Sequence, residues 1–188
     1  MFKLVENTLT VTGPVKKLER FQGIAEPLSM ERLLPTPEDF REIMTGTNTI
    51  DGVKYRMWML CYTKEIPIPE LVKRRFLIRY GTVCRNQWRI ANWGTRFDLV
   101  VGGKETEVKG VKIPYGLKYC FETTSSPPLP FVKNLSKTFP TLAFRLHFID
   151  FPDFEGEFWA QGGNKLHYAD WQPSYEGWGE VQEEVGSK

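Results

Sequence analysis

Apolar and polar side chains alternate in several stretches of this chain, a period of two that is typical of half-buried β-strands. The alternation predicts strands at residues 8–12, 117–123, 142–149, 155–161 and 165–168. Gly162-Gly163-Asn164 separates the last two strands and indicates a hairpin. Strands joined in this way are typical of an antiparallel sheet.

Other stretches place apolar residues three or four positions apart, which predicts helices. Val15, Leu18 and Phe21 follow Pro14, which suits a first helical position because its φ is preset and it has no N–H. Similar patterns predict helices at residues 14–22, 38–44, 70–80 and 128–138.

The remaining segments are less regular. Residues 29–34 fit a strand or a turn, residues 45–55 an exposed loop, and residues 57–62 either a helix or a strand. Glycines at positions 102, 103 and 110 indicate a short hairpin before the strand at 117–123.

A strand followed by a helix occurs near the N-terminus, and a strand–helix–strand unit spans residues 117–149. Two such units on one antiparallel sheet form a ferredoxin-like α+β sandwich with helices on one face. We therefore predict a single ferredoxin-like domain over residues 1–188. A mostly helical, basic insertion at about 36–96 would separate the two halves, and an acidic tail would occupy about 172–188.

Composition excludes several classes of protein. An apolar fraction of 41% is enough for a hydrophobic core, which argues against global disorder. The sequence has no apolar run of about 18 residues that could span a bilayer, and its N-terminus does not resemble a signal peptide. Cys61, Cys84 and Cys120 form no C-x-x-C pair, so neither a disulfide framework nor a zinc site is indicated. We expect a soluble, cytoplasmic protein with no membrane contact.

Charge is distributed unevenly, although the formal net charge is only +2. Residues 71–97 contain seven lysines and arginines and no acidic residue, whereas nine acidic residues and two lysines follow from Asp150 onward. The small net charge argues against a protein that coats nucleic acid. The asymmetry indicates a charged partner or a charge match within the chain.

The basic segment also carries aromatic residues, and it is the strongest candidate for binding. Lysine and arginine neutralise phosphates, and an exposed ring adds about 1–3 kcal/mol of stacking per base. The alternative is that the rings belong to the core and the charges only solvate the surface. The candidate residues for binding a partner or nucleic acid are Lys73, Arg74, Arg79, Arg85, Trp88, Arg89, Trp93 and Arg96.

A second candidate is a pocket between two short polar blocks, NWGT at 92–95 and SPP at 126–128. If both blocks cap the sheet, their polar side chains would lie close together. The alternative is a tight turn in which Gly94 takes a positive φ and Trp93 is a buried anchor. The residues of the possible pocket are Asn92, Thr95, Asp98, Thr123 and Ser125.

The two histidines decide whether an enzyme is indicated. His147 and Glu122 lie on the polar sides of their predicted strands and could form an acid–base couple. No catalytic motif accompanies them, and a surface histidine opposite a carboxylate is usually a cross-strand pair. We predict no catalytic residue, no metal site and no cofactor, because the histidines, cysteines and carboxylates lack metal-ligand spacing.

Five segments of the chain resemble the YubB ferredoxin-like family, which is encoded mainly by phages, plasmids and genomic islands of bacteria. They are LTVTGP at 9–14, LLPTPEDF at 33–40, NWGTRFD at 92–98, FETTSSPPLP at 121–130 and LSKTFP at 135–140. The resemblance implies a ferredoxin-like sheet and a mobile-element origin, but no established activity. The chain lacks the four cysteines that would hold an iron–sulfur cluster.

These observations favour a non-enzymatic binding protein of a phage or plasmid that engages a host protein or protein complex. Inhibition of a host defence system is a natural task for such a gene. The alternative is a single-stranded nucleic-acid-binding protein that uses residues 71–97, and an uncharacterised enzyme is third. The acidic tail has three interpretations: a solvated end, a cover for the basic segment, or a mimic of nucleic acid.

Overall fold

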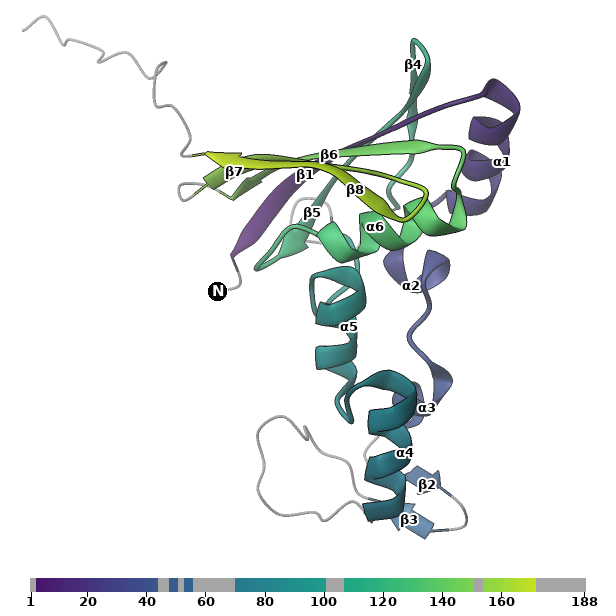
Figure 1. Ribbon diagram of the computed structural model, residues 1–188, viewed down its shortest axis with the longest axis vertical. Coiled ribbons are helices and arrows are strands. Elements are labelled where there is room, and N and C mark those ends of the chain that lie inside the picture. Colours follow the sequence, from purple (N-terminus) through teal and green to yellow (C-terminus); the bar gives the residue numbers. More distant parts are fainter. Residues whose placement is uncertain are drawn as a thin grey trace, which may run out of the picture.

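The computed structural model describes residues 3–43, 48–50, 53–55, 70–100, 107–150 and 154–171, and the structural statements below concern these residues. The described part of the chain contains both helices and strands (Figure 1). In chain order they are β1 (Leu4–Thr12), α1 (Val15–Ala25), α2 (Met30–Leu33), α3 (Glu38–Ile43), β2 (Asn48–Ile50), β3 (Val53–Tyr55), α4 (Glu70–Tyr80), α5 (Arg85–Trp93), β4 (Val111–Ile113), β5 (Gly116–Thr124), α6 (Leu129–Thr138), β6 (Ala143–Asp150), β7 (Phe154–Gln161) and β8 (Asn164–Trp171).

Six of the described strands form one sheet in the order β4-β5-β1-β6-β7-β8, and every neighbouring pair is antiparallel. β1 is central, because it pairs with β5 along its whole length and with β6 from Glu6 to Thr12. The protein is therefore of the α+β class, with an antiparallel sheet and helices.

The sheet buries one of its two faces. Leu9 and Val11 of β1, which point to the same face, are fully buried. Phe21 of α1 packs edge-on against Phe144, with ring centroids 5.7 Å apart, and against Tyr119 at 6.2 Å. α6 lies along the same side of the sheet (Figure 1). The side chains of the opposite face remain partly exposed, and we call this side the open face.

Between α1 and β4 lies an arm, which we define as the elements α2, α3, β2, β3, α4 and α5 (Figure 1). An aromatic cluster holds its helices together. The Phe40 ring of α3 lies 5.2 Å from Phe76, 4.9 Å from Tyr80 and 6.4 Å from Trp88. Burial, together with a 2.7 Å hydrogen bond to Asp39, raises the pKa of Tyr80.

Most of the predicted elements are confirmed, including the five predicted strands, which all belong to the six-stranded sheet, and the four predicted helices. Three segments differ. Residues 29–34 contain the one-turn helix α2, because the Ser29 hydroxyl accepts a hydrogen bond from Arg32 N. Within 45–55, the predicted loop contains the short strands β2 and β3. Residues 85–93 form α5, a helix that the sequence pattern did not predict.

The hairpin near the middle of the chain also lies elsewhere than predicted. β4 and β5 turn at Pro114-Tyr115, several residues after Gly110. Positions 102 and 103, residues 57–62 and the tail at 172–188 lie outside the described residues.

Two further results bear on the class of protein. Cys84 is disulfide-bonded, so the expectation that no disulfide forms is wrong for this residue. Within the described ranges, every helix is too short or too polar to cross a membrane.

We expect Gly94→Ala to destabilise the protein by about 3 kcal/mol, because two costs add. Gly94 ends α5 with φ +91°, and a Cβ there would lie 2.8 Å from Pro127 O and 2.9 Å from Pro130 Cδ. Gly81→Ala is the control, since Gly81 has φ +71° and a Cβ at that position would meet nothing within 4 Å. It should cost about 1 kcal/mol. Urea unfolding of both variants measures the difference, and equal costs would contradict the close packing at Gly94.

Candidate functional site

The NWGT and SPP blocks, which the sequence left as a possible pocket, contact each other. Thr95 Oγ1 donates to Thr124 O at 2.9 Å, and Ser126 Oγ donates to Gly94 O. Asn134 Nδ2 of α6 reaches Asn92 O at 3.1 Å. Because these polar groups bond one another and Thr95 is buried, the contact is a packed junction between α5 and the sheet.

The other members of the predicted pocket have structural partners as well. Asp98 accepts hydrogen bonds from Ser29 Oγ at 2.6 Å and from Met30 N at 2.7 Å, so it holds the start of α2. Thr123 is fully buried and donates to Ser126 O at 2.8 Å. Ser125 is exposed, with φ +69°, and its amide donates to Lys3 O at 2.8 Å.

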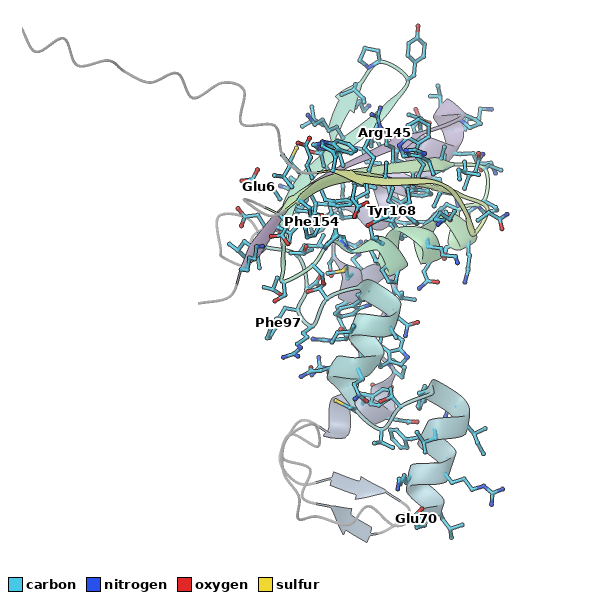
Figure 2. All side chains as sticks on the ribbon, turned by 60° about the vertical axis from the view of Figure 1, so that its left-hand side comes forward. Glu6, Glu70, Phe97, Arg145, Phe154 and Tyr168 are labelled. Atoms are coloured by element: carbon cyan, nitrogen blue, oxygen red, sulfur yellow. The ribbon has the colours of Figure 1, made fainter. Side chains whose placement is uncertain are left out.

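The rings of the basic segment are mostly buried. Trp93 is 0% exposed, and its indole N–H donates to Leu34 O at 2.9 Å. Trp88 is 8% exposed and lies 6.3 Å from Trp93 in an edge-on arrangement. Neither ring is available as an exposed stacking platform. The exposed ring of this segment is Phe97, at 45% (Figure 2).

Arg89 is committed to the structure of the arm. Its Nη2 donates to Glu31 Oε2 at 2.7 Å, and its Nε donates to Thr36 Oγ1 at 3.0 Å. The guanidinium also lies 4.4 Å from the centroid of the Trp93 ring. These contacts join α2, α5 and the segment before α3, so Arg89 has little surface left for a partner.

The remaining predicted basic residues lie in several environments. Lys73, Arg74 and Arg96 are exposed, whereas Arg85 is half-buried at the start of α5. Arg79 is exposed and bonds Asp39 at 3.4 Å, while Lys73 pairs with Glu70 at the same distance. The two helices of the basic segment therefore differ. The basic side chains of α4 are exposed to solvent, whereas on α5 Arg85 is half-buried and Arg89 is bonded within the arm.

α4 exposes apolar side chains together with these charges. Leu71 is 82% exposed and Ile78 is 77% exposed, and a spacing of seven residues places them on the same side of the helix. Arg74 lies between them on that side, because it is three residues from Leu71 and four from Ile78. Phe76, which is buried, points to the opposite side. We call Leu71, Arg74 and Ile78 the outer face of α4.

The open face of the sheet is a second surface, and it holds a shallow cavity of about 320 Å³. Figure 2 shows Arg145 on the side of the sheet turned away from the helices, far from Glu70 on the arm. The residues that line the cavity are Thr8, Thr10, Lys118, Arg145, His147 and Glu157.

Ion pairs order the side chains around this cavity. Arg145 bonds Glu157, and His147 Nε2 lies 2.7 Å from Glu155 Oε1. The sequence left a couple of His147 with Glu122 conceivable, but the carboxylate that His147 bonds is Glu155 of β7. Burial disfavours the charged Glu157 carboxylate, but the hydrogen bond and charge of Arg145 outweigh that effect and lower the pKa of Glu157.

No group of three or more histidine, cysteine or acidic side chains that could hold a metal ion occurs among the residues with described positions. The open face was not recognised as a surface from the sequence. The sequence feature that could have revealed it is the set of polar residues in the alternating strands, such as Thr8, Thr10 and Lys118. These positions indicated exposure, but not which strands would be neighbours.

Comparison with known proteins identifies a fold but no family. No family model and no curated protein matches the chain. One similar solved structure is the crystal structure of a protein api92 from Yersinia pseudotuberculosis, which carries the family designation DUF1281. The match has a TM-score of 0.53 and 9% sequence identity, and it covers 93% of this chain and 99% of that one. At this identity the likeness concerns the fold alone.

We expect Arg89→Lys to destabilise the protein by about 1–3 kcal/mol, although the charge is kept. A lysine ammonium cannot make the bonds to Glu31 and Thr36 while covering the Trp93 ring. Arg74→Lys on the outer face of α4 is the control and should change stability by less than about 0.5 kcal/mol. Equal stabilities in urea unfolding would mean that Arg89 is not a structural residue.

Glu157→Gln should make the stability of the protein less dependent on pH below 4.5, the ordinary pKa of this carboxyl. Because folding lowers the pKa of Glu157, its ionised form stabilises the folded state above the unfolded pKa. That contribution is lost as the pH falls through the folded-state pKa. The free energy of unfolding, measured in urea between pH 7 and pH 3, should therefore decline more steeply for the wild type. Parallel curves for the two proteins would contradict the pairing with Arg145.

Proposed function

We propose that this chain is a non-enzymatic binding protein that docks through the outer face of α4 onto a protein partner. The partner's site would be an apolar groove with an acidic rim. One observation carries the proposal: α4 leaves Leu71 and Ile78 mostly exposed on both sides of Arg74. Large side chains exposed together on a protruding element are typical of interaction surfaces.

The chemistry of this face favours protein over nucleic acid. Leucine and isoleucine gain from burial in an apolar groove, at about 25 cal/mol for each Å² of apolar surface removed from water, but they cannot stack on bases. The two tryptophans predicted as stacking platforms, Trp88 and Trp93, are buried. Arg74 and Arg79 would steer an acidic partner and increase the rate of association.

The arrangement of the sheet supports a finer assignment, which is also part of the proposal. β1 and α1 would form the first half of a ferredoxin-like domain, with β4, β5, α6 and β6 completing it in the order β4-β5-β1-β6. The arm would be the insertion between the halves, and β7 and β8 would extend the sheet. The insertion proposed at about 36–96 would include most of the arm, whose first element is α2.

The segments resembling the YubB ferredoxin-like family support a phage or plasmid origin for the gene. The partner would then be a protein or protein complex in the cytoplasm of the bacterial host, and a defence system is one possible target. This step rests on the resemblance and on the exposed face of α4, since a shared fold by itself does not define a function.

The test compares two double variants, each of which replaces two exposed apolar side chains by serine. Leu71→Ser with Ile78→Ser removes the outer face of α4, whereas Val15→Ser with Leu166→Ser removes side chains that are 69% and 59% exposed elsewhere. We expect the wild type and the Val15→Ser, Leu166→Ser variant to capture the same host protein. The Leu71→Ser, Ile78→Ser variant should bind that protein at least tenfold more weakly. Thermal unfolding should show that both variants remain folded.

Two outcomes would overturn the proposal. One is the absence of any reproducible partner in cross-linked host lysates. The other is a partner that binds all three proteins equally, because its contact would then lie outside the outer face of α4.

A further inference from the structure

Strand register aligns one side chain from each of the six strands in a single row across the open face. Residues directly opposite each other in neighbouring strands point to the same side of a sheet. The row crosses the sheet at right angles to the strands, over about 24 Å at the usual strand spacing. Its members are Val111, Lys118, Thr10, Arg145, Trp159 and His167, and we call it the basic row.

Charge changes from row to row across this face. The basic row has two cations and no carboxylate. Two rows away, acidic side chains come from three strands: Glu122, Glu6 and Glu155. Between them lies the row with His147 and Glu157. A linear polyanion therefore meets attraction along the basic row and repulsion from the acidic one, so its path across the sheet is set by charge.

The basic row also presents rings. Trp159 is 39% exposed, and its ring centroid lies 5.2 Å from that of His167, which is exposed too. The Arg145 guanidinium lies 5.1 Å from the centroid of the Trp159 ring, on the strand next to it. Glu157 bonds Nη2 of Arg145 and the indole N–H of Trp159, which holds both side chains in place.

We propose that the basic row binds a single-stranded nucleic acid. Bases would stack on Trp159 and His167, and phosphates would contact Lys118 and Arg145, which are two strands or about 10 Å apart. The Thr8 and Thr10 hydroxyls, between these cations in the shallow cavity, would supply hydrogen bonds to phosphate or sugar. This site lies on the sheet and is independent of the docking face on α4.

Binding at the basic row should depend only moderately on salt. Two phosphate contacts on a single strand correspond to a slope of about −1.4 in log affinity against log salt concentration. This value is small because Lys118 and Arg145 are the two cations of the row. A protein that used the basic charges of α4 and α5 as well would show a slope several times steeper.

The experiment measures fluorescence anisotropy of labelled oligo(dT) and oligo(U), about ten nucleotides long, with the full chain at low and physiological salt. Trp159→Leu and Lys118→Gln should each weaken binding by tenfold or more for at least one oligomer. The matched controls are Tyr168→Leu on β8 and Lys112→Gln on β4. They also remove an aromatic ring and an ammonium group, but from the helix-facing side of the sheet. The controls should bind as the wild type does.

Quenching of tryptophan fluorescence provides a second measurement that does not depend on a variant being folded. The wild type should be quenched by the oligomers, since stacking places a base on Trp159. No binding to either oligomer at low salt would overturn the proposal, as would equal losses in the variants and their controls. Variants of Leu71 and Ile78 should bind the oligomers normally, so failure of the docking proposal is distinguishable from failure of this one.

Discussion

The pairing of β1 between β5 and β6 is the constraint on which the rest of this structure depends. β1 is the first strand of the chain, yet both of its neighbours come from beyond residue 115. These pairings set the register of the central rows. They also decide that Leu9, Tyr119 and Leu146 share the buried face, where burial of large apolar side chains contributes about 2 kcal/mol each.

The arm is held by interactions of another kind. Its helices share an aromatic cluster around Phe40, and Arg89 links α2 to α5 through Glu31 and Thr36. The arm joins the sheet at the junction of Gly94 with Pro127 and of Asn92 with α6. The exposed surface of α4 is formed by side chains that make none of these contacts, among them Leu71 and Ile78.

Sequence patterns predicted much of the fold, and the reasons for the exceptions are physical. Alternation identified β5 and β6 because one face of each strand is buried and the other is not. α5 was missed because its charged and apolar residues were interpreted as a binding segment, and its start has no side-chain cap. The strand or turn expected at 29–34 became helix α2 because Asp98, distant in sequence, accepts its first amide hydrogens.

The same distinction applies to the candidate sites. The sequence by itself determined that Lys118 and Arg145 lie on the polar sides of their strands and that Trp159 belongs to a strand, because these follow from local periodicity. It also determined that residues 70–80 are basic. The tertiary structure alone decided that those three side chains share one row, because register depends on pairings between distant strands. It also decided that Trp93 is buried while Ile78 is exposed. Both are large apolar residues, and their surroundings are set by which distant segment packs against each helix.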